Sequence, residues 1–245
     1  MEISRELKVM YSDYYLDQKV LKKRNITAQQ SIHNIKKIIP FRTYKSVIDI
    51  GAGDGSVLEK LANYGITSEL HAVEISESGV SCIQAKKIGN LHSVRQFDGY
   101  TIPPRPDSND LNYELGLAIH VLEHVEHERA FLNEISKKCD YLYIEVPLEL
   151  TINLNRNMQR GIPFGHINYY NSATFRNLLE SSNLEIIEFK ILTASLDYEI
   201  FISGKIRGRI KSIFRSCLLK LFPSIAPIFL TYMAGVYCKR IDLKS

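Results

Sequence analysis

The sequence has no tryptophan, only four cysteines and no uninterrupted apolar run long enough to cross a bilayer. The cysteines are Cys82, Cys139, Cys217 and Cys238. Because they lie far apart and form no C-x-x-C pair, they indicate neither a zinc site nor a disulfide framework. The longest apolar stretch, residues 225–238, is interrupted by Pro227 and is shorter than the roughly 20 residues that a membrane-spanning helix needs. The N-terminus lacks the apolar segment of a secretory signal. We therefore expect a cytoplasmic protein with free thiols.

Acidic residues are absent between Glu199 and Asp242. The cations in that stretch are Lys205, Arg207, Arg209, Lys211, Arg215, Lys220, Lys239 and Arg240. These eight exceed the net charge of +4, and without them 23 basic residues face 27 acidic ones. The sequence therefore combines a slightly acidic body with a basic tail. So small an overall excess gives no reason to expect a nucleic-acid partner.

From residue 44 onward, short β-branched runs alternate with helical patterns. Strands are expected at 47–50, 70–75, 91–97, 115–119, 141–146, 184–191 and 230–237, and helices at 56–61, 76–87, 126–138 and 172–181. This alternation predicts an α/β fold with a mostly parallel seven-stranded sheet and helices on both faces. Ahead of it, Ile32, Ile35, Ile38 and Ile39 recur at helical spacing, which predicts an N-terminal helical cap near the ligand edge of the sheet.

A glycine-rich loop, Gly51-Ala52-Gly53-Asp54-Gly55, follows the first expected strand and precedes a helix. Open α/β sheets bind ligands at this position, where glycines let the backbone approach closely. Glu74 ends the second strand, where a carboxylate can accept both hydroxyls of a ribose. The alternative for the loop is a tight turn that binds no ligand, and the alternative for Glu74 is a solvated acid at the end of a strand. Ser56 stands where the dinucleotide fingerprint has Gly or Ala, which favours a nucleotide other than a nicotinamide dinucleotide.

Five segments carry a family resemblance that spans about residues 46–190. Residues 47–55 resemble the first motif of class I S-adenosylmethionine-dependent methyltransferases, and 71–76 and 96–99 resemble the segments that hold ribose and adenine. His120-Val121-Leu122-Glu123-His124-Val125 and Gly165-His166-Ile167-Asn168-Tyr169-Tyr170-Asn171 resemble a branch that includes glycan and quinone methyltransferases. A long polar loop, residues 103–112, and the basic tail depart from the family's pattern.

The resemblance implies a Rossmann-like fold, S-adenosylmethionine as cofactor and methyl transfer as the reaction. It implies that Glu74 holds the ribose and that Asp98 meets the adenine. The full set of cofactor-binding residues that it implies is Asp49, Gly51, Ala52, Gly53, Gly55, Glu74, Ile75, Asp98, Gly99 and His120. It also organises the chain as one domain, with a cap at 1–43, a cofactor-binding core at 44–198 and a basic helix with the last strand at 199–245.

Histidine is the natural general base near neutral pH, and the matched segments contain His120, His124 and His166. Each is a catalytic candidate, with capping, packing or holding a loop in shape as the alternative role. Glu145 and Glu149 flank a strand end and are able to pair with a histidine. The His120-x-x-Glu123-His124 spacing is not H-E-x-x-H and has no evident third ligand, so no metal site is expected.

Two segments of the sequence bear on the acceptor. Residues 147–170 form a long insertion rich in amide, guanidinium and aromatic groups, which suits a sugar but also a solvated loop. Apolar residues between 206 and 221 recur on one helical face. We expect the helix within residues 205–222 to have one of three roles. It contacts an anionic membrane, packs on the sheet, or holds the phosphates of a nucleotide-linked sugar.

We therefore predict a methyltransferase that O-methylates a sugar, glycan or other small polar acceptor, with a His general base. The alternatives are a quinone or lipid-linked acceptor, a nicotinamide-dependent oxidoreductase, and a non-catalytic peripheral membrane protein.

Overall fold

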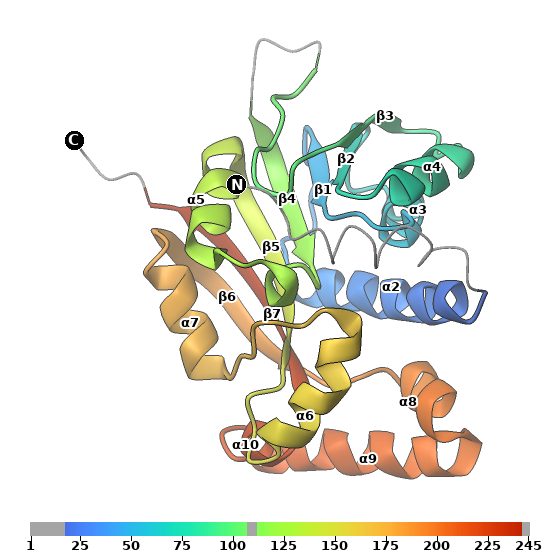
Figure 1. Cartoon of the computed structure of the whole chain (residues 1–245), viewed down its shortest axis with the longest axis vertical. Helices are drawn as coiled ribbons and strands as arrows, with labels where there is room; N and C mark the ends of the chain where they lie inside the picture. The colour runs from blue at the N-terminus through green and yellow to red at the C-terminus, as the bar shows by residue number, and fades with distance from the viewer. Residues whose placement is uncertain (1–17, 107–111, 242–245) are drawn as a thin grey trace.

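The computed structural model describes residues 18–106 and 112–241, and Figure 1 draws the path of the chain. A seven-stranded sheet runs through it in the order β3-β2-β1-β4-β5-β7-β6. The strands are β1 (Val47–Ile50), β2 (Leu70–Glu74), β3 (Leu91–Gln96), β4 (Tyr113–Ile119), β5 (Cys139–Leu148), β6 (Leu184–Leu192) and β7 (Tyr232–Arg240). All neighbouring strands pair in parallel except β7, which is antiparallel to both β5 and β6. The predicted mostly parallel seven-stranded sheet is confirmed.

Two apolar clusters cover the two faces of this sheet. The helices are α2 (Gln18–Ile38), α3 (Ser56–Tyr64), α4 (Glu77–Ala85), α5 (Glu128–Lys138), α6 (Leu154–Gly161), α7 (Ser172–Glu180), α8 (Leu196–Ser203), α9 (Lys205–Leu221) and α10 (Ala226–Phe229), with the short 3-10 turns η2 (Leu122–His124) and η3 (Ile162–Phe164). One cluster packs α5 and α7, through Phe131 and Phe175, on the sheet. The other packs α2, α3 and α4 on the opposite face, through Ile35, Leu58 and Ile83.

The helix α2 belongs to the segment expected to form an N-terminal cap. Its buried isoleucines Ile32, Ile35 and Ile38 face the core, as their helical spacing predicts. The helix contacts α3, α8, β6 and β7, so it crosses from the first half of the sheet to the last (Figure 1). Residues 1–17 of the expected cap lie outside the described residues.

The region 147–170, expected as an insertion without assigned structure, contains α6 and η3. The helix α8 was also not expected, and it precedes the basic helix α9. In Figure 1, α9 runs along one margin of the molecule beside α8 and α10, and it contacts the sheet at the start of β7, where the Tyr232 hydroxyl donates to the carbonyl oxygen of Arg215. Within residues 18–106 and 112–241, no helix has the length and hydropathy that crossing a bilayer requires.

The apolar side of α9 faces outward. Ile206, Ile210 and Ile213 are 76%, 64% and 65% exposed, whereas Gly208 on the opposite side is buried. A Cβ atom at Gly208 would lie 2.6 Å from the backbone of Ile200, so α9 meets α8 through this glycine. The interpretation in which the apolar residues of this helix pack on the sheet is therefore wrong.

Candidate active site

The glycine loop is shaped by a close approach between β1 and the segment that follows β4. Gly51 has a φ of 75°, in the left-handed region that side chains rarely adopt. A Cβ atom there would also lie 2.8 Å from Cγ2 of Val121. The loop therefore lies against the turn that carries the HxxEH segment, and a glycine is required at its first position.

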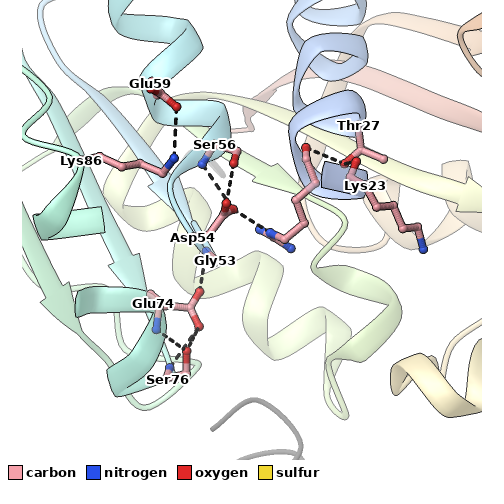
Figure 2. A network of polar contacts seen from close by, with 11 residues as sticks. Lys23, Thr27, Gly53, Asp54, Ser56, Glu59, Glu74, Ser76 and Lys86 are labelled. Carbon is pink, nitrogen blue, oxygen red and sulfur yellow. Dashed lines mark hydrogen bonds and ion pairs between the residues drawn. The ribbon is translucent and has the colours of Figure 1, made fainter. Parts of the chain in front are cut away.

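The carboxylate of Glu74 accepts a hydrogen bond from the glycine loop, as Figure 2 shows. The backbone N–H of Gly53 donates to its Oε2 at 2.8 Å, and the N–H and hydroxyl of Ser76 both donate to its Oε1 at 3.0 Å. Glu74 is buried at the end of β2, as the sequence predicts. Each carboxylate oxygen has two acceptor positions, so Glu74 has capacity left for a ribose hydroxyl.

A second carboxylate fastens the same loop to α2. Nε of Arg24 donates to Oδ1 of Asp54 at 2.7 Å, and Ser56 donates to the same carboxylate (Figure 2). Burial would raise the pKa of Asp54, but the Arg24 charge and the Ser56 hydrogen bond outweigh it and lower the pKa. The glycine loop and α2 are thus joined by an ion pair between a partly exposed arginine and a buried carboxylate.

Asp49 lies beneath the loop in β1 and is almost fully buried. Its Oδ2 atom has no hydrogen-bond partner among the described residues. Burial raises the pKa of Asp49 to about 7, against the opposing charge of Arg24. Its role in holding the cofactor stays a prediction.

Asp98 forms a turn after β3. Its Oδ1 accepts the backbone N–H groups of Tyr100 at 2.8 Å and Thr101 at 2.6 Å, and its Oδ2 accepts the Thr101 hydroxyl at 2.8 Å. Both oxygens therefore stabilise the turn, and Asp98 is not a wall residue of the cavity described next. The neighbouring Gly99 and Tyr100 do face that cavity. Contact between Asp98 and adenine stays a prediction.

A cavity of about 1520 Å³ joins the glycine loop to α8 and α9. Of the predicted site residues, its wall contains Gly51, Glu74, Ile75, Gly99, His120, His124 and His166. The predicted residues Asp49, Ala52, Gly53, Gly55 and Asp98 are not in the wall. Ligand cavities commonly measure about 300–1,000 Å³, so this one has room for two ligands.

His120 ends β4 with a φ of 55°, an uncommon conformation for a residue with a side chain. Its Nδ1 lies 3.2 Å from Oε1 of Glu123 and its Nε2 lies 3.4 Å from Oε1 of Glu145. Burial alone would lower the pKa of His120, but the two carboxylates outweigh it and raise the pKa to about 10. A histidine that is protonated at neutral pH is a poor general base.

The carboxylate of Glu145 also binds α2. The Ser31 hydroxyl donates to Oε1 at 2.9 Å and the Asn34 amide donates to Oε2 at 3.0 Å. Burial would raise the pKa of Glu145, but its contact with His120 outweighs that effect and lowers it. Glu145 therefore connects α2, β5 and His120 in one buried polar network.

The Gly-His loop, residues 165–171, is attached to η2 by hydrogen bonds to backbone carbonyl oxygens. The carbonyl oxygen of Glu123 accepts the N–H groups of Ile167 at 2.8 Å and Asn168 at 3.1 Å. The Asn168 amide in turn donates to the carbonyl oxygens of Leu122 at 3.0 Å and Val125 at 2.6 Å. Two segments about forty residues apart in the sequence are thus brought together at the cavity.

This attachment brings His124 and His166 edge to face, with 5.0 Å between their ring centroids. Nδ1 of His124 lies 3.0 Å from the carbonyl oxygen of Gly165, and Nδ1 of His166 lies 2.8 Å from Oε2 of Glu149. Burial lowers the pKa of His124, with a smaller opposing effect from Glu123. His124 and His166 are accordingly grouped, and His120 belongs to a separate ion-paired arrangement.

The sequence interpretation missed the residues of α2 and α8 that complete the cavity wall. Arg24 and Ser31 face it from α2, and Tyr198 and Glu199 face it from α8. Nζ of Lys23 lies 4.4 Å from the centre of the Phe164 ring, so α2 and η3 meet beside the cavity. The isoleucine spacing predicted a helix here, but no local signal indicated which of its polar residues reach the site.

Residues 22–189 match a family described as "Methyltransferase domain". The chain belongs to this methyltransferase family. The enzyme is therefore a transferase that uses S-adenosylmethionine, and the family match favours this activity over the nicotinamide-dependent alternative. A search of curated proteins finds no match.

Solved structures with the same fold have dissimilar sequences. Magnesium protoporphyrin IX methyltransferase from Synechocystis PCC 6803, with bound S-adenosylhomocysteine, is 16% identical with a TM-score of 0.57, covering 96% of this chain and 93% of its own. A Haemonchus contortus phosphoethanolamine N-methyltransferase is 12% identical with a TM-score of 0.60, covering 86% and 52%. The [4+2]-cyclase SpnF is 10% identical with a TM-score of 0.59, covering 87% and 81%. These likenesses establish the fold of the enzyme.

The residues of the enzyme fit its cofactor. The loop at Gly51 leaves no space for a Cβ atom and so brings bare backbone to the cavity wall. The buried Glu74 carboxylate ends the neighbouring strand in the same wall, with acceptor positions suited to ribose hydroxyls. Gly51 and Glu74 would therefore hold the nucleoside end of S-adenosylmethionine.

Proposed function

We propose that the enzyme O-methylates a hydroxyl group of a sugar, a glycan or another small polar acceptor. The single observation that carries this proposal is the cavity, which continues from Gly51 and Glu74 to the grouped histidines His124 and His166. When bound, S-adenosylmethionine supplies a methyl group already activated by its positive sulfonium. What the chain must add is alignment of the acceptor and removal of the hydroxyl proton.

His166 is the best-placed general base of the three candidates. Its Nδ1 donates to Glu149, so in the neutral ring the lone pair lies on Nε2, and the residue is part of the cavity wall. Glu149 also stabilises the charge that the ring gains with the proton, as an acid behind a catalytic histidine does. His120, held between two carboxylates, serves instead to position the η2 segment.

Polar groups beyond the histidines support a hydroxyl-rich acceptor. Asn157 and Arg160 of α6, and Arg207 and Lys211 of α9, belong to the same wall. Amide and guanidinium groups hydrogen-bond sugar hydroxyls and phosphates. The acceptor end of the cavity therefore contains both cationic donors and the carboxylates of Glu149 and Glu199.

Methyl transfer from labelled S-adenosylmethionine to sugar, lipid and quinone fractions of a cell extract tests this proposal. Label in the sugar fraction supports it, whereas label confined to another fraction contradicts it. With the acceptor found this way, His166→Ala should lower turnover roughly 10²–10⁴-fold while S-adenosylhomocysteine affinity is kept. The control is His33→Ala, because His33 is exposed on α2 and is not part of the cavity wall.

A membrane-associated role for α9 is a second candidate, favoured by its outward apolar side. Ile206, Ile210 and Ile213 form an exposed stripe, flanked by the exposed cations Arg209 and Lys220. With no acidic residue between 200 and 241, the charge around the stripe complements anionic lipid. The other side of α9 contributes to the cavity wall, so such a contact would bring a lipid-linked acceptor or a quinone to the site at the cytoplasmic face of a membrane.

Sedimentation with vesicles tests this contact. The enzyme should pellet with vesicles of phosphatidylglycerol and phosphatidylcholine but not with phosphatidylcholine alone. The double variant Ile210→Asp, Ile213→Asp should stay in the supernatant, while Phe41→Asp, which changes an 80% exposed apolar residue elsewhere, should pellet. Equal pelleting of both variants would contradict a contact through α9.

A further inference from the structure

Three potential metal ligands converge where η2 meets the Gly-His loop. One carboxylate oxygen of Glu123 and one ring nitrogen from each of His124 and His166 lie within 4.8 Å of one another. In a tetrahedral site with bonds of about 2.0–2.2 Å, ligand atoms are about 3.4 Å apart. Shortening these separations by up to about 1.4 Å would therefore close the three groups around one ion.

Nδ1 of each histidine is already hydrogen-bonded, so Nε2 is the atom that would bind an ion. A carbonyl oxygen only accepts, so Nδ1 of His124 carries the hydrogen that it donates to Gly165, and the Glu149 carboxylate fixes Nδ1 of His166 in the same way. In the neutral rings both lone pairs then lie on Nε2. Metal-binding histidines nearly always donate their other nitrogen to a carboxylate or a carbonyl, and this cluster contains one of each.

The third ligand contributes an oxygen that the described protein leaves unsatisfied. Glu123 is 1% exposed, and its Oε1 lies 3.2 Å from Nδ1 of His120. Its Oε2 is buried and has no hydrogen-bond partner among the described residues. An unpartnered oxygen of a buried carboxylate is costly. A cation beside Oε2 would remove that cost.

The backbone fixes the relative position of the ligands. Glu123 supplies the carbonyl that accepts the N–H groups of Ile167 and Asn168, which directly follow His166. The site is therefore assembled by hydrogen bonds that do not involve the ligand atoms. All three ligands belong to the cavity wall, so the fourth coordination position opens toward the acceptor.

We propose that Glu123, His124 and His166 bind one divalent transition-metal ion of the zinc type. Two imidazoles and a carboxylate suit Zn²⁺ and its neighbours better than Mg²⁺, which prefers an all-oxygen shell. The sequence analysis expected no metal because the His120-x-x-Glu123-His124 spacing has no third ligand nearby. His166 is that ligand, and only folding brings it to η2.

The position of the ion gives it a use that rests on the proposed O-methylation. A hydroxyl bound at the open position has a lowered pKa, so its O–H bond breaks near neutral pH, the electron pair stays on oxygen and the proton passes to bulk water. In the metal-loaded enzyme His166 then acts as a ligand, and the ion replaces it as the group that activates the acceptor.

Metal titration of the full-length chain tests the site independently of catalysis. After treatment with a chelator and its removal, the protein is titrated with ZnCl₂, MnCl₂ or MgCl₂ in a calorimeter. We expect about one Zn²⁺ per chain, weaker Mn²⁺ binding and no saturable Mg²⁺ binding. Co²⁺ should give visible absorption bands of a four-coordinate site with nitrogen and oxygen ligands.

Variants assign the ligands. Glu123→Gln, His124→Ala and His166→Ala should each weaken Zn²⁺ binding at least about 100-fold, and Glu149→Gln, which removes only the negative charge behind His166, about 10–100-fold. His33→Ala should bind as the parent does. S-adenosylhomocysteine binding by every variant checks that it is folded, and Glu149→Gln serves if a ligand variant fails to fold.

Absence of saturable Zn²⁺ binding, or equal binding by the parent and the ligand variants, would overturn the site. Methyl transfer separates this failure from failure of the proposed function. If the chelated enzyme methylates a hydroxyl acceptor at an undiminished rate, the proposed use of the metal is contradicted and the proposed O-methylation is supported. If the protein binds Zn²⁺ through the three ligands but methylates no hydroxyl compound, the metal site stands and the proposed function falls.

Discussion

At the scale of single residues, the site depends on a few residues whose surroundings determine what each one does. Gly51 lets the loop approach η2, Glu74 anchors the loop, and His120 is fixed as a cation between two carboxylates. The positions of Gly51 after β1 and of Glu74 at the end of β2 were predictable because they depend on the order of residues along those strands, but their contacts with η2 and with the Gly53 N–H were not. The role of His120 was not, because Glu145, one of its two partners, comes from β5.

Gly51→Ala should weaken cofactor binding. The substitution adds a Cβ atom 2.8 Å from the stiff side chain of Val121, in addition to the left-handed backbone strain of about 1–2 kcal/mol. The matched control is Gly65→Ala, because Gly65 has a φ of 72° but nothing within 4 Å of a Cβ atom. Equilibrium dialysis against labelled S-adenosylmethionine should show at least a ~10-fold loss for the first variant and none for the second. Equal losses would mean that general strain, and not the loop, is responsible.

Asp49 makes the stability of the protein depend on pH. Burial raises its pKa from 3.8 in the unfolded chain to about 7 in the fold, so the folded protein holds the proton more tightly. The contribution of Asp49 to the free energy of unfolding is therefore largest below about pH 4 and is lost as the pH rises toward 7. Asp49→Asn, which cannot ionise, should therefore gain stability relative to the parent between pH 5 and pH 8, by roughly 2 kcal/mol. Urea unfolding followed by circular dichroism measures the difference, and a gap that is constant with pH would contradict this account.

At the scale of elements, α2 and α9 enclose the site from two sides. The strands and the helices α3, α4, α5 and α7 were predictable because each has its own periodicity, and α4 and α7 also begin at side-chain caps, Ser76 and Asn171. The helices α6 and α8 were not. The helix α6 has a one-sided pattern, but it is short and mostly polar and so resembles a loop, whereas the apolar residues of α8 are not confined to one side.

The attachment of α2 to β5 contributes to the stability of the whole fold. Asn34→Leu removes the amide that donates to the buried Glu145 carboxylate and should cost about 1.5–3 kcal/mol, because a hydrogen bond to a charge is lost. On the same helix, His33→Leu changes an exposed residue and should stay within about 0.5 kcal/mol of the parent. Chemical denaturation compares the two variants, and equal stabilities would show that α2 is held by its apolar side alone.

The contact between α8 and α9 depends on Gly208. Gly208→Ala should destabilise the protein by about 1–3 kcal/mol, because the new methyl group would meet the Ile200 backbone at 2.6 Å. This loss should appear although alanine is the better helix former by about 1 kcal/mol. Gly89→Ala, at a position with open space around it, is the control. A gain in melting temperature for Gly208→Ala would contradict the close packing of the two helices.

At the scale of the whole molecule, strand order 3-2-1-4-5-7-6 gathers the ends of β1, β2, β4 and β5 around one cavity. The sequence predicted these ends because the carboxyl ends of parallel strands share an edge. It could not predict that the Gly-His loop returns to η2, since the hydrogen bonds from Ile167 and Asn168 to Glu123 join distant segments through backbone atoms. The grouping of Glu123, His124 and His166 depends on that return.

The large-scale charge distribution follows the same architecture. The basic tail forms α9, whose Lys211 and Arg215 lie 3.2 Å and 3.5 Å from the buried Glu199 carboxylate while its apolar stripe faces outward. The amphipathic pattern predicted the helix, but only the packing of Gly208 on α8 decides which side is exposed.

The most direct test of the central claim is a calorimetric titration of the purified protein with S-adenosylhomocysteine and, in parallel, with NAD. The cavity built around Gly51 and Glu74 predicts one saturable site per chain for S-adenosylhomocysteine and much weaker binding of NAD. Saturable binding of NAD with no heat from S-adenosylhomocysteine would contradict it.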